Sequence, residues 1–201
     1  MKLKKEDLFL TIEKSLINAR ELYIDAKILK DNKRFERAYT CFQFCIEEIG
    51  KAALTYQYML DDDSSKSGNF LKDFRNHQTK TNTAIGIDLI MVKTMEDPII
   101  KKKILVNTKI QGENIEYFNS HKNYSLYTSI INEKPYLPSE IITPKNLDDI
   151  EFNATIRLHV AEQFYKIGIQ EFDSVLKAHK EMDKEKVLEK MINEVKQIMN
   201  T

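Results

Sequence analysis

Apolar residues recur every three or four positions along most of the chain, which is the spacing of one face of an α-helix. The first such stripe predicts a helix over residues 5–30, and Asp31 and Asn32 end it. A second stripe predicts a helix over about residues 35–60, and a run of Asp and Ser at 61–65 ends it. Because only a short connection separates them, we expect these two helices to pack as an antiparallel hairpin.

The later part of the chain predicts further helices around one irregular segment. Helical spacing continues over Phe70–Met95, where Asp97-Pro98 ends it, and over Ile99–Phe118. Residues 119–146 hold three of the four prolines and show no sustained period, so we expect an ordered connection with turns or a flexible lid. The longest regular stripe, Ala154–Val175, then predicts a last long helix.

A charged C-terminal helix is predicted over residues 183–200. Its apolar stripe is narrow and consists of Leu188, Met191, Ile192, Val195 and Ile198. A narrow stripe is typical of a helix that docks on a partner or on a second copy in a dimer. No segment predicts a strand, so the fold class is all-α: an antiparallel helical bundle with an irregular loop segment before the last long helix.

Length and composition indicate a single domain. The chain has 201 residues, 42% of them hydrophobic and 31% charged, which suits one globular core over about residues 5–178, followed by the C-terminal helix. A second catalytic domain has no room. No apolar run approaches the roughly 20 residues that a membrane helix needs, so we expect no membrane association and a cytoplasmic location.

Charge and cysteine content exclude several kinds of site. The 31 basic and 31 acidic residues cancel, so any RNA binding must come from a local patch. Cys41 and Cys45 lie one helical turn apart with no further metal ligand nearby in the sequence, which favours reduced core thiols over a disulfide or a metal site. The sequence has no glycine-rich phosphate loop and no zinc spacing, and we expect neither metal nor cofactor.

The predicted second helix carries two neighbouring carboxylates. At about 100° per residue, Glu48 lies on the shoulder of the apolar stripe, whereas Glu47 points almost the opposite way. Lys51 follows Glu48 by one turn, and this spacing suits either a functional pair or an ordinary surface ion pair. Gly50 lies between them, and a glycine inside a helix suggests that another backbone approaches closely.

The predicted third helix offers a similar polar pair. His77 lies at the edge of its apolar stripe, Lys80 follows by one turn, and Lys72 and Arg75 add to a local basic strip. The strip suits a phosphate backbone, although a solvated helix face explains it equally well. Because antiparallel packing brings the shoulders of neighbouring stripes together, we expect Glu48, Lys51, His77 and Lys80 to converge in one phosphate-binding pocket.

The irregular segment combines basic and aromatic residues around Lys122 and Tyr127. Aromatic rings there can stack on RNA bases, or they can simply hold the loop against the helices. Arg157 and His159 are two residues apart, so on a helix they face different ways, and neither suggests catalysis.

Three segments together resemble the AbiV family of bacterial abortive-infection proteins. They are Glu47-Glu48-Ile49-Gly50-Lys51-Ala52, the spacing from His77 to Lys80, and Lys122 followed by Leu126-Tyr127; Pro138-Ser139-Glu140-Ile141 also fits. The resemblance implies the HEPN superfamily of helical bundles, whose members commonly dimerise and include many metal-independent ribonucleases. Their usual Arg-to-His spacing of about four to six residues is absent here.

The resemblance implies antiphage defence that arrests translation or RNA metabolism in the infected cell, after activation by a phage-encoded protein. As a ribonuclease, the chain would use His77 as general acid or base, Lys80 and Lys51 to stabilise the phosphorane, and Glu48 to orient one of these lysines. The residues expected to contact RNA or a partner are Glu47, Arg75, Lys122 and Tyr127. We also expect a homodimer. The alternative is a non-enzymatic protein that sterically blocks the translation machinery, such as the ribosome, or a phage protein.

Overall fold

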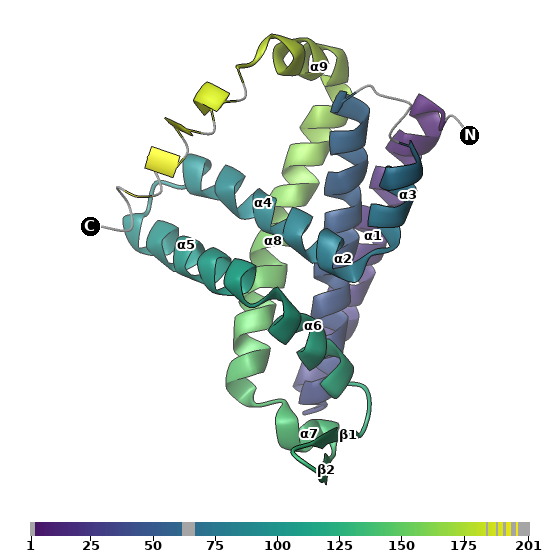
Figure 1. Cartoon of the computed structure of the whole chain (residues 1–201), viewed down its shortest axis with the longest axis vertical. Coiled ribbons are helices and arrows are strands. Elements are labelled where there is room, and N and C mark those ends of the chain that lie inside the picture. The colour runs from purple at the N-terminus through teal and green to yellow at the C-terminus, as the bar shows by residue number, and fades with distance from the viewer. Residues whose placement is uncertain are drawn as a thin grey trace.

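The computed structural model describes residues 3–61, 67–183, 185–187, 189–190, 192–193 and 196. The elements in chain order are α1 (Lys5–Asp31), α2 (Phe35–Asp61), α3 (Ser67–Arg75), α4 (His77–Thr94), α5 (Pro98–Glu113), α6 (Ile115–Tyr124), β1 (Ser129–Ile131), β2 (Lys134–Tyr136), α7 (Pro138–Ile141), α8 (Pro144–Gln170) and α9 (Phe172–Glu181). The all-α prediction is confirmed, and α1 and α2 form the expected hairpin (Figure 1).

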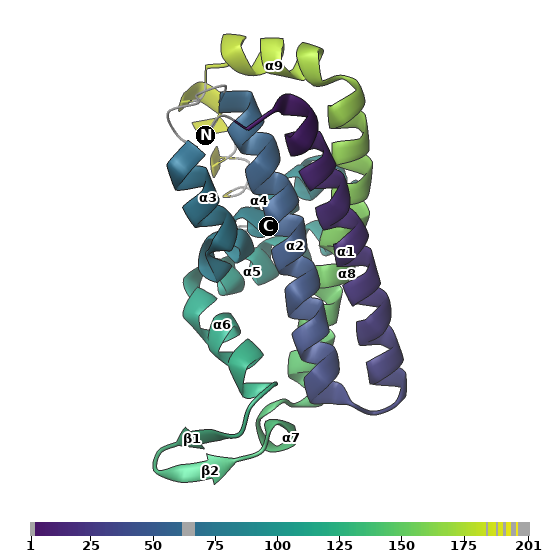
Figure 2. The ribbon, with the colours of Figure 1, turned by 90° about the vertical axis from the view of Figure 1, so that its right-hand side faces the viewer.

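Helix α2 lies at the centre of the bundle. It packs against α1 on one side and against α8, α4 and α6 on others (Figure 2). Phe42, Cys45 and Ile49 are fully buried, and so are residues on the other faces of the helix, such as Ile46. Burying a side chain of this size stabilises the fold by about 1.5–3 kcal/mol. Helix α2 is therefore buried on most of its circumference, not along one stripe.

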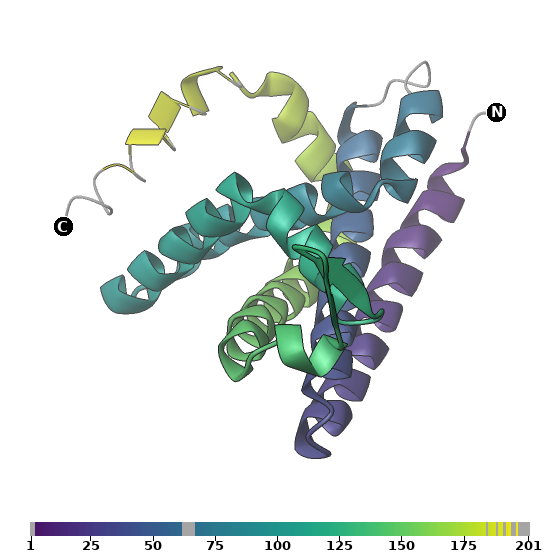
Figure 3. The ribbon, with the colours of Figure 1, turned by 60° about the horizontal axis from the view of Figure 1, so that its bottom comes forward.

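A second, smaller core joins the α4–α5 hairpin to α8. The hairpin extends away from the α1–α2 pair, as Figure 3 shows. Its apolar side chains cluster around Met91 and Ile104. The same three helices are joined by hydrogen bonds of the fully buried Arg157 in α8. Arg157 donates two hydrogen bonds to Asp88 of α4, at 2.8 and 2.6 Å, and one to Gln111 of α5 at 2.6 Å. Such a pair costs about 3–5 kcal/mol to break, so Arg157 anchors the hairpin to α8.

Two predicted helices are each broken at an asparagine. The predicted helix over Phe70–Met95 is two helices, because Asn76 leaves the helical conformation and its side chain accepts a hydrogen bond from the backbone N–H of Thr79 at 3.0 Å. The predicted helix over Ile99–Phe118 is likewise divided at Asn114 into α5 and α6. Asparagine is a preferred helix cap, which explains the first break.

The irregular segment contains more regular structure than the sequence predicts. Lys122 lies in α6, and β1 pairs with β2 in an antiparallel hairpin that the sequence analysis missed. Asn132 and Glu133 form its two-residue turn with positive φ angles of 50° and 65°, as a type I′ turn requires. The strands are only three residues long, too short for a clear alternating pattern. Thr143 then caps α8, which begins at Pro144 and stops at Gln170, before α9 turns away.

The predicted C-terminal helix lies largely outside the described residues, which leave out Leu188, Met191, Val195 and Ile198. Within the described part of the chain, no helix has the length and apolar character that crossing a bilayer requires.

Candidate active site

A buried carboxylate of α2, Glu47, binds side chains from two other helices. Its Oε1 accepts a hydrogen bond from Lys122 Nζ of α6 at 2.8 Å. Its Oε2 lies 2.5 Å from His77 Nδ1 and 3.1 Å from Lys80 Nζ, both in α4. We refer to Glu47, His77, Lys80 and Lys122 as the Glu47 cluster. Three helices that are distant in sequence therefore meet at one carboxylate.

The charges of the Glu47 cluster do not cancel. Lys80 and Lys122 are buried, and they bring two positive charges to the single negative charge of Glu47. Burial by itself raises the pKa of Glu47, but the hydrogen bonds from Lys122 and His77 and the nearby charge of Lys80 outweigh burial, so the pKa lies below its ordinary 4.5. The carboxylate is thus ionised at neutral pH, and the cluster keeps an excess of positive charge.

His77 is the exposed member of the cluster. Its side chain is 53% exposed, compared with 3% for Glu47. With Nδ1 held by the carboxylate, Nε2 has no hydrogen-bond partner among the described residues. His77 is also the first residue of α4, where the helix dipole presents its positive end. A carboxylate that orients an imidazole, with the far nitrogen open, is the arrangement of a general acid or base.

The backbones of α2 and α4 touch beside the cluster, at Gly50. A Cβ atom at this position would lie 2.0 Å from the carbonyl oxygen of Lys80, so no residue but glycine fits without a shift of the helices. The close approach that the sequence predicts at Gly50 is confirmed. This backbone contact fixes the separation of α2 and α4, and therefore the distance from Glu47 to His77 and Lys80.

Comparison with known proteins assigns a family to this architecture. The family model described as AbiV, named HEPN_AbiV, matches residues 8–158, which is well over half of the chain. The chain belongs to the AbiV family. The matched range includes all four residues of the Glu47 cluster, and membership indicates a part in abortive infection, a defence against phage. No curated protein and no solved structure matches.

In this AbiV family member, Glu48 and Lys51 form a pair of their own. Lys51 Nζ lies 2.5 Å from Glu48 Oε1 one turn away and sits over the ring of Phe74. Among the described residues, no hydrogen bond or ion pair joins Glu48 or Lys51 to the Glu47 cluster. That Glu48 and Lys51 share one pocket with His77 and Lys80 stays a prediction. Helix α2 is packed on several faces, and the face carrying Glu47, which the sequence analysis took to point away, meets α4 and α6.

Three further predicted residues have different surroundings. Lys122, predicted in the loop, is buried in α6 as part of the cluster. Arg75 is exposed at the end of α3, next to Asn76 and His77. Tyr127 is 65% exposed just after α6. Their proposed contacts with RNA or a partner stay predictions.

Other titratable groups of this AbiV family member lie outside the cluster. Burial raises the pKa of the Cys45 thiol, and both Cys41 and Cys45 are free, so Cys45 is a core side chain and not a nucleophile. Among the described residues, no group of three or more His, Cys, Asp or Glu side chains has the geometry of a metal site.

Proposed function

We propose that this AbiV family member arrests the infected cell, within the cytoplasm, by cutting RNA without a metal ion. The observation that carries the proposal is the hydrogen bond between Glu47 Oε2 and His77 Nδ1, which leaves the far nitrogen of a half-exposed ring open. In this mechanism His77 Nε2 takes the proton of a ribose 2′-hydroxyl. The 2′-oxygen attacks the adjacent phosphorus, the bond to the 5′-oxygen breaks, and water protonates that oxygen.

The positive charge of the cluster supports the same chemistry. Negative charge develops on the phosphorane as the 2′-oxygen attacks, and the surplus charge of Lys80 and Lys122 together with the N-terminus of α4 stabilises it. Arg75 precedes this N-terminus by two residues and can hold a neighbouring phosphate, while the exposed ring of Tyr127 can stack on a base. Glu47 takes the orienting role that the sequence analysis gave to Glu48.

Activation by a phage-encoded protein is part of the proposal. A protein that arrests its own host must be restrained until infection, and a binding partner that shifts a conformational equilibrium can release it. Residues 125–143, which carry the β-hairpin, expose Ile130 and Leu137 and suit such contact. Cells that make the protein without phage should therefore grow nearly normally, and full growth arrest without phage would contradict the requirement for a trigger.

Purified protein incubated with RNA, with and without an extract of phage-infected cells, tests the cleavage. We expect fragments that end in a 2′,3′-cyclic phosphate and begin with a 5′-hydroxyl, in the presence of EDTA. His77→Ala should lower the rate by at least about 100-fold, which is typical for the loss of a general base.

The matched control is His159→Ala, because His159 is also an exposed helical histidine but lies outside the cluster. It should cleave like the wild type. An absence of cleavage under every condition, with phage protection intact, would instead support the non-enzymatic alternative, in which the protein blocks a partner sterically.

A further inference from the structure

Helix α5 carries an apolar row on the face that points away from the bundle. Its inner face, with Ile104 and Leu105, is buried in the smaller core. On the outer face Ile99, Val106 and Ile110 are 79, 36 and 47% exposed. At about 100° per residue they lie within about 40° of one another, so they form one straight row about 16 Å long. We refer to these three residues as the α5 row.

Lysines flank the α5 row on both sides. The charged residues of α5 are Lys101, Lys102, Lys103, Lys109 and Glu113. Around the helix, Lys102 and Lys109 lie on one side of the row and Lys103 lies on the other, and all three are exposed. Glu113 is 4.0 Å from Lys109 and offsets only part of this charge. The outer face of α5 is therefore both apolar and basic.

Two carboxylates precede α5 and do not lie along its flanks. Asp97 caps the helix, and its side chain accepts hydrogen bonds from the backbone N–H groups of Ile99 and Ile100 at 2.8 and 3.2 Å. Glu96 lies one residue earlier. Over residues 93–113, five lysines outnumber three carboxylates, although the whole chain is neutral. The α4–α5 hairpin is thus a local basic patch.

We propose that the α5 row and its lysines bind the surface of an anionic lipid bilayer, with α5 lying in the plane of the interface. The apolar side chains enter the boundary between headgroups and acyl chains, and the flanking lysines bind headgroup phosphates. An RNA backbone fits this face less well, because it would place charged phosphates against the apolar row. The sequence analysis considered only the length that a spanning helix needs, and a helix that lies on a bilayer does not need it.

The position of α5 makes the row accessible to an extended surface. Helix α5 lies at the periphery of the molecule (Figure 1), on the hairpin that extends away from α1 and α2 (Figure 3). Lys102 forms no ion pair among the described residues. The ammonium group of Lys103 lies 4.1 Å from the centre of the Phe152 ring, but its side chain is not buried there. The lysines can therefore reach headgroups beside the row.

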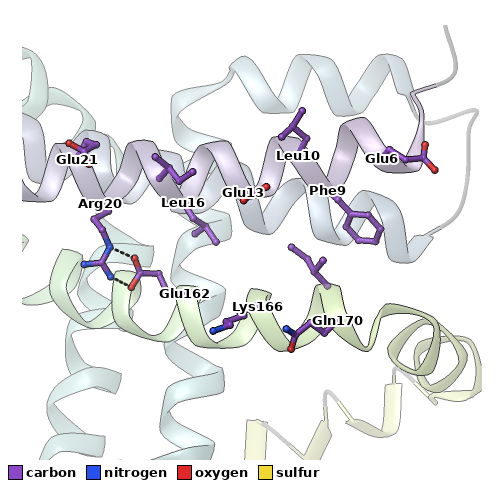
Figure 4. Close-up of a pocket in the computed structure, with 12 residues that line it drawn as sticks. Glu6, Phe9, Leu10, Glu13, Leu16, Arg20, Glu21, Glu162, Lys166 and Gln170 are labelled. Atoms are coloured by element: carbon purple, nitrogen blue, oxygen red, sulfur yellow. Dashed lines mark hydrogen bonds and ion pairs between the residues drawn. The ribbon is translucent and has the colours of Figure 1, made fainter.

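A second exposed apolar surface has the opposite charge. The groove between α1 and α8 has apolar residues such as Phe9 and Leu10 (Figure 4). Its lining also holds four acidic and two basic residues, which are Glu6, Glu13, Glu21, Glu162, Arg20 and Lys166. Anionic lipid would be repelled from this surface. Ile24 of α1 is 43% exposed, close to the value for Ile110, and is therefore the matched control position.

Co-sedimentation with lipid vesicles tests the proposal without measuring RNA cleavage. One set of vesicles has about a third phosphatidylglycerol in phosphatidylcholine, and the other has phosphatidylcholine alone. We expect the wild type to bind only the anionic vesicles and to be released as the ionic strength rises from about 0.05 to 0.5 M. Ile110→Asp and the double variant Lys102→Glu, Lys109→Glu should each lower the affinity at least about tenfold. Ile24→Asp should bind like the wild type, and all variants should keep the wild-type thermal midpoint because these side chains are exposed.

Tryptophan fluorescence supplies an independent measurement. The chain contains no tryptophan, so Ile110→Trp reports on this position alone. Anionic vesicles should shift its emission to shorter wavelength, and brominated acyl chains should quench it, because an indole ring in the interface leaves water. Ile24→Trp should show neither effect. The proposal is overturned if the wild type does not bind anionic vesicles, if it binds neutral vesicles equally well, if the α5 variants keep full affinity, or if the emission of Ile110→Trp does not shift.

Discussion

Glu47 neutralises part of the charge of two buried ammonium groups and fixes the orientation of one imidazole. Lys80 and Lys122 have almost no contact with water, so their charges depend on this carboxylate. The side chain of His77, by contrast, is about half exposed, so the fold loses little free energy if the hydrogen bond between His77 and Glu47 is removed. Glu47 therefore contributes to stability and, in the proposed mechanism, also orients His77, whose own contribution to stability is small.

Glu47→Gln should destabilise the fold by about 3 kcal/mol at pH 7, because it leaves two buried lysines without a counter-charge. Glu48→Gln is the matched control, since it removes the neighbouring carboxylate whose only described partner is Lys51, and it should cost at most about 1 kcal/mol. Urea unfolding measures both values. Equal losses in the two variants would show that Glu47 is not the centre of the cluster.

The destabilisation should also depend on pH. The pKa of Glu47 is lowered in the fold, so its contribution is fully present above the ordinary pKa of 4.5 and is lost as the pH falls through the folded-state pKa. The difference in unfolding free energy between the wild type and Glu47→Gln should therefore be constant from pH 7 to about 5.5 and shrink below pH 4.5. A difference that stays constant to pH 3 would contradict the ionised, hydrogen-bonded carboxylate.

The sequence alone predicts some of the cluster and not the rest. His77 and Lys80 interrupt an apolar stripe one turn apart, so they can be recognised locally. Glu47 was taken to point away because only one stripe of α2 was considered. Tyr39, Ile46 and Ala53 lie about 100° around the helix from Glu47, so they show only that the apolar surface of α2 is wider than one stripe. The face of Glu47 itself carries the buried polar residues Thr40 and Gln43, which give no apolar signal.

At the scale of helices, the packing of α2 on α4 determines the geometry of the cluster. The two backbones approach at Gly50, and Glu47 lies almost one turn earlier on the same side of α2. A wider separation of the helices would move Lys80 and His77 away from the carboxylate.

Gly50→Ala should therefore be strongly destabilising, by about 3 kcal/mol or more, because its Cβ atom would overlap the backbone of Lys80. Gly86→Ala is the matched control: it lies inside α4, a Cβ atom there meets nothing within 4 Å, and alanine should stabilise the helix by about 0.5–1 kcal/mol. Thermal unfolding followed by circular dichroism measures both. If Gly50→Ala were as stable as the wild type, the close approach of α2 and α4 would be refuted.

The sequence predicts the ends of some helices better than others. Helices α1 and α2 end near the predicted residues because polar runs interrupt their stripes there. The break at Asn76 was missed because the stripe of Phe70, Phe74, Thr81 and Ile85 keeps its spacing across the boundary between α3 and α4. Only the cap geometry of Asn76 reveals that His77 begins a new helix.

At the scale of the whole molecule, α2 separates the Glu47 cluster from helix α1. The Glu47 cluster lies on the side of α4 and α6, whereas α1 covers another side of α2 and exposes apolar residues such as Ile17. Lys122 reaches Glu47 from 75 positions away, a contact that local periodicity cannot predict.

The efficiency with which a phage forms plaques on cells carrying His77→Ala tests the central claim most directly. We expect protection to be lost while the thermal midpoint of the purified variant stays within about 2 °C of the wild type, because a half-exposed side chain contributes little to folding. Cells carrying His159→Ala should remain protected. Full protection by His77→Ala would contradict a catalytic role for the Glu47 cluster, and lost protection with a collapsed midpoint would make His77 a structural residue.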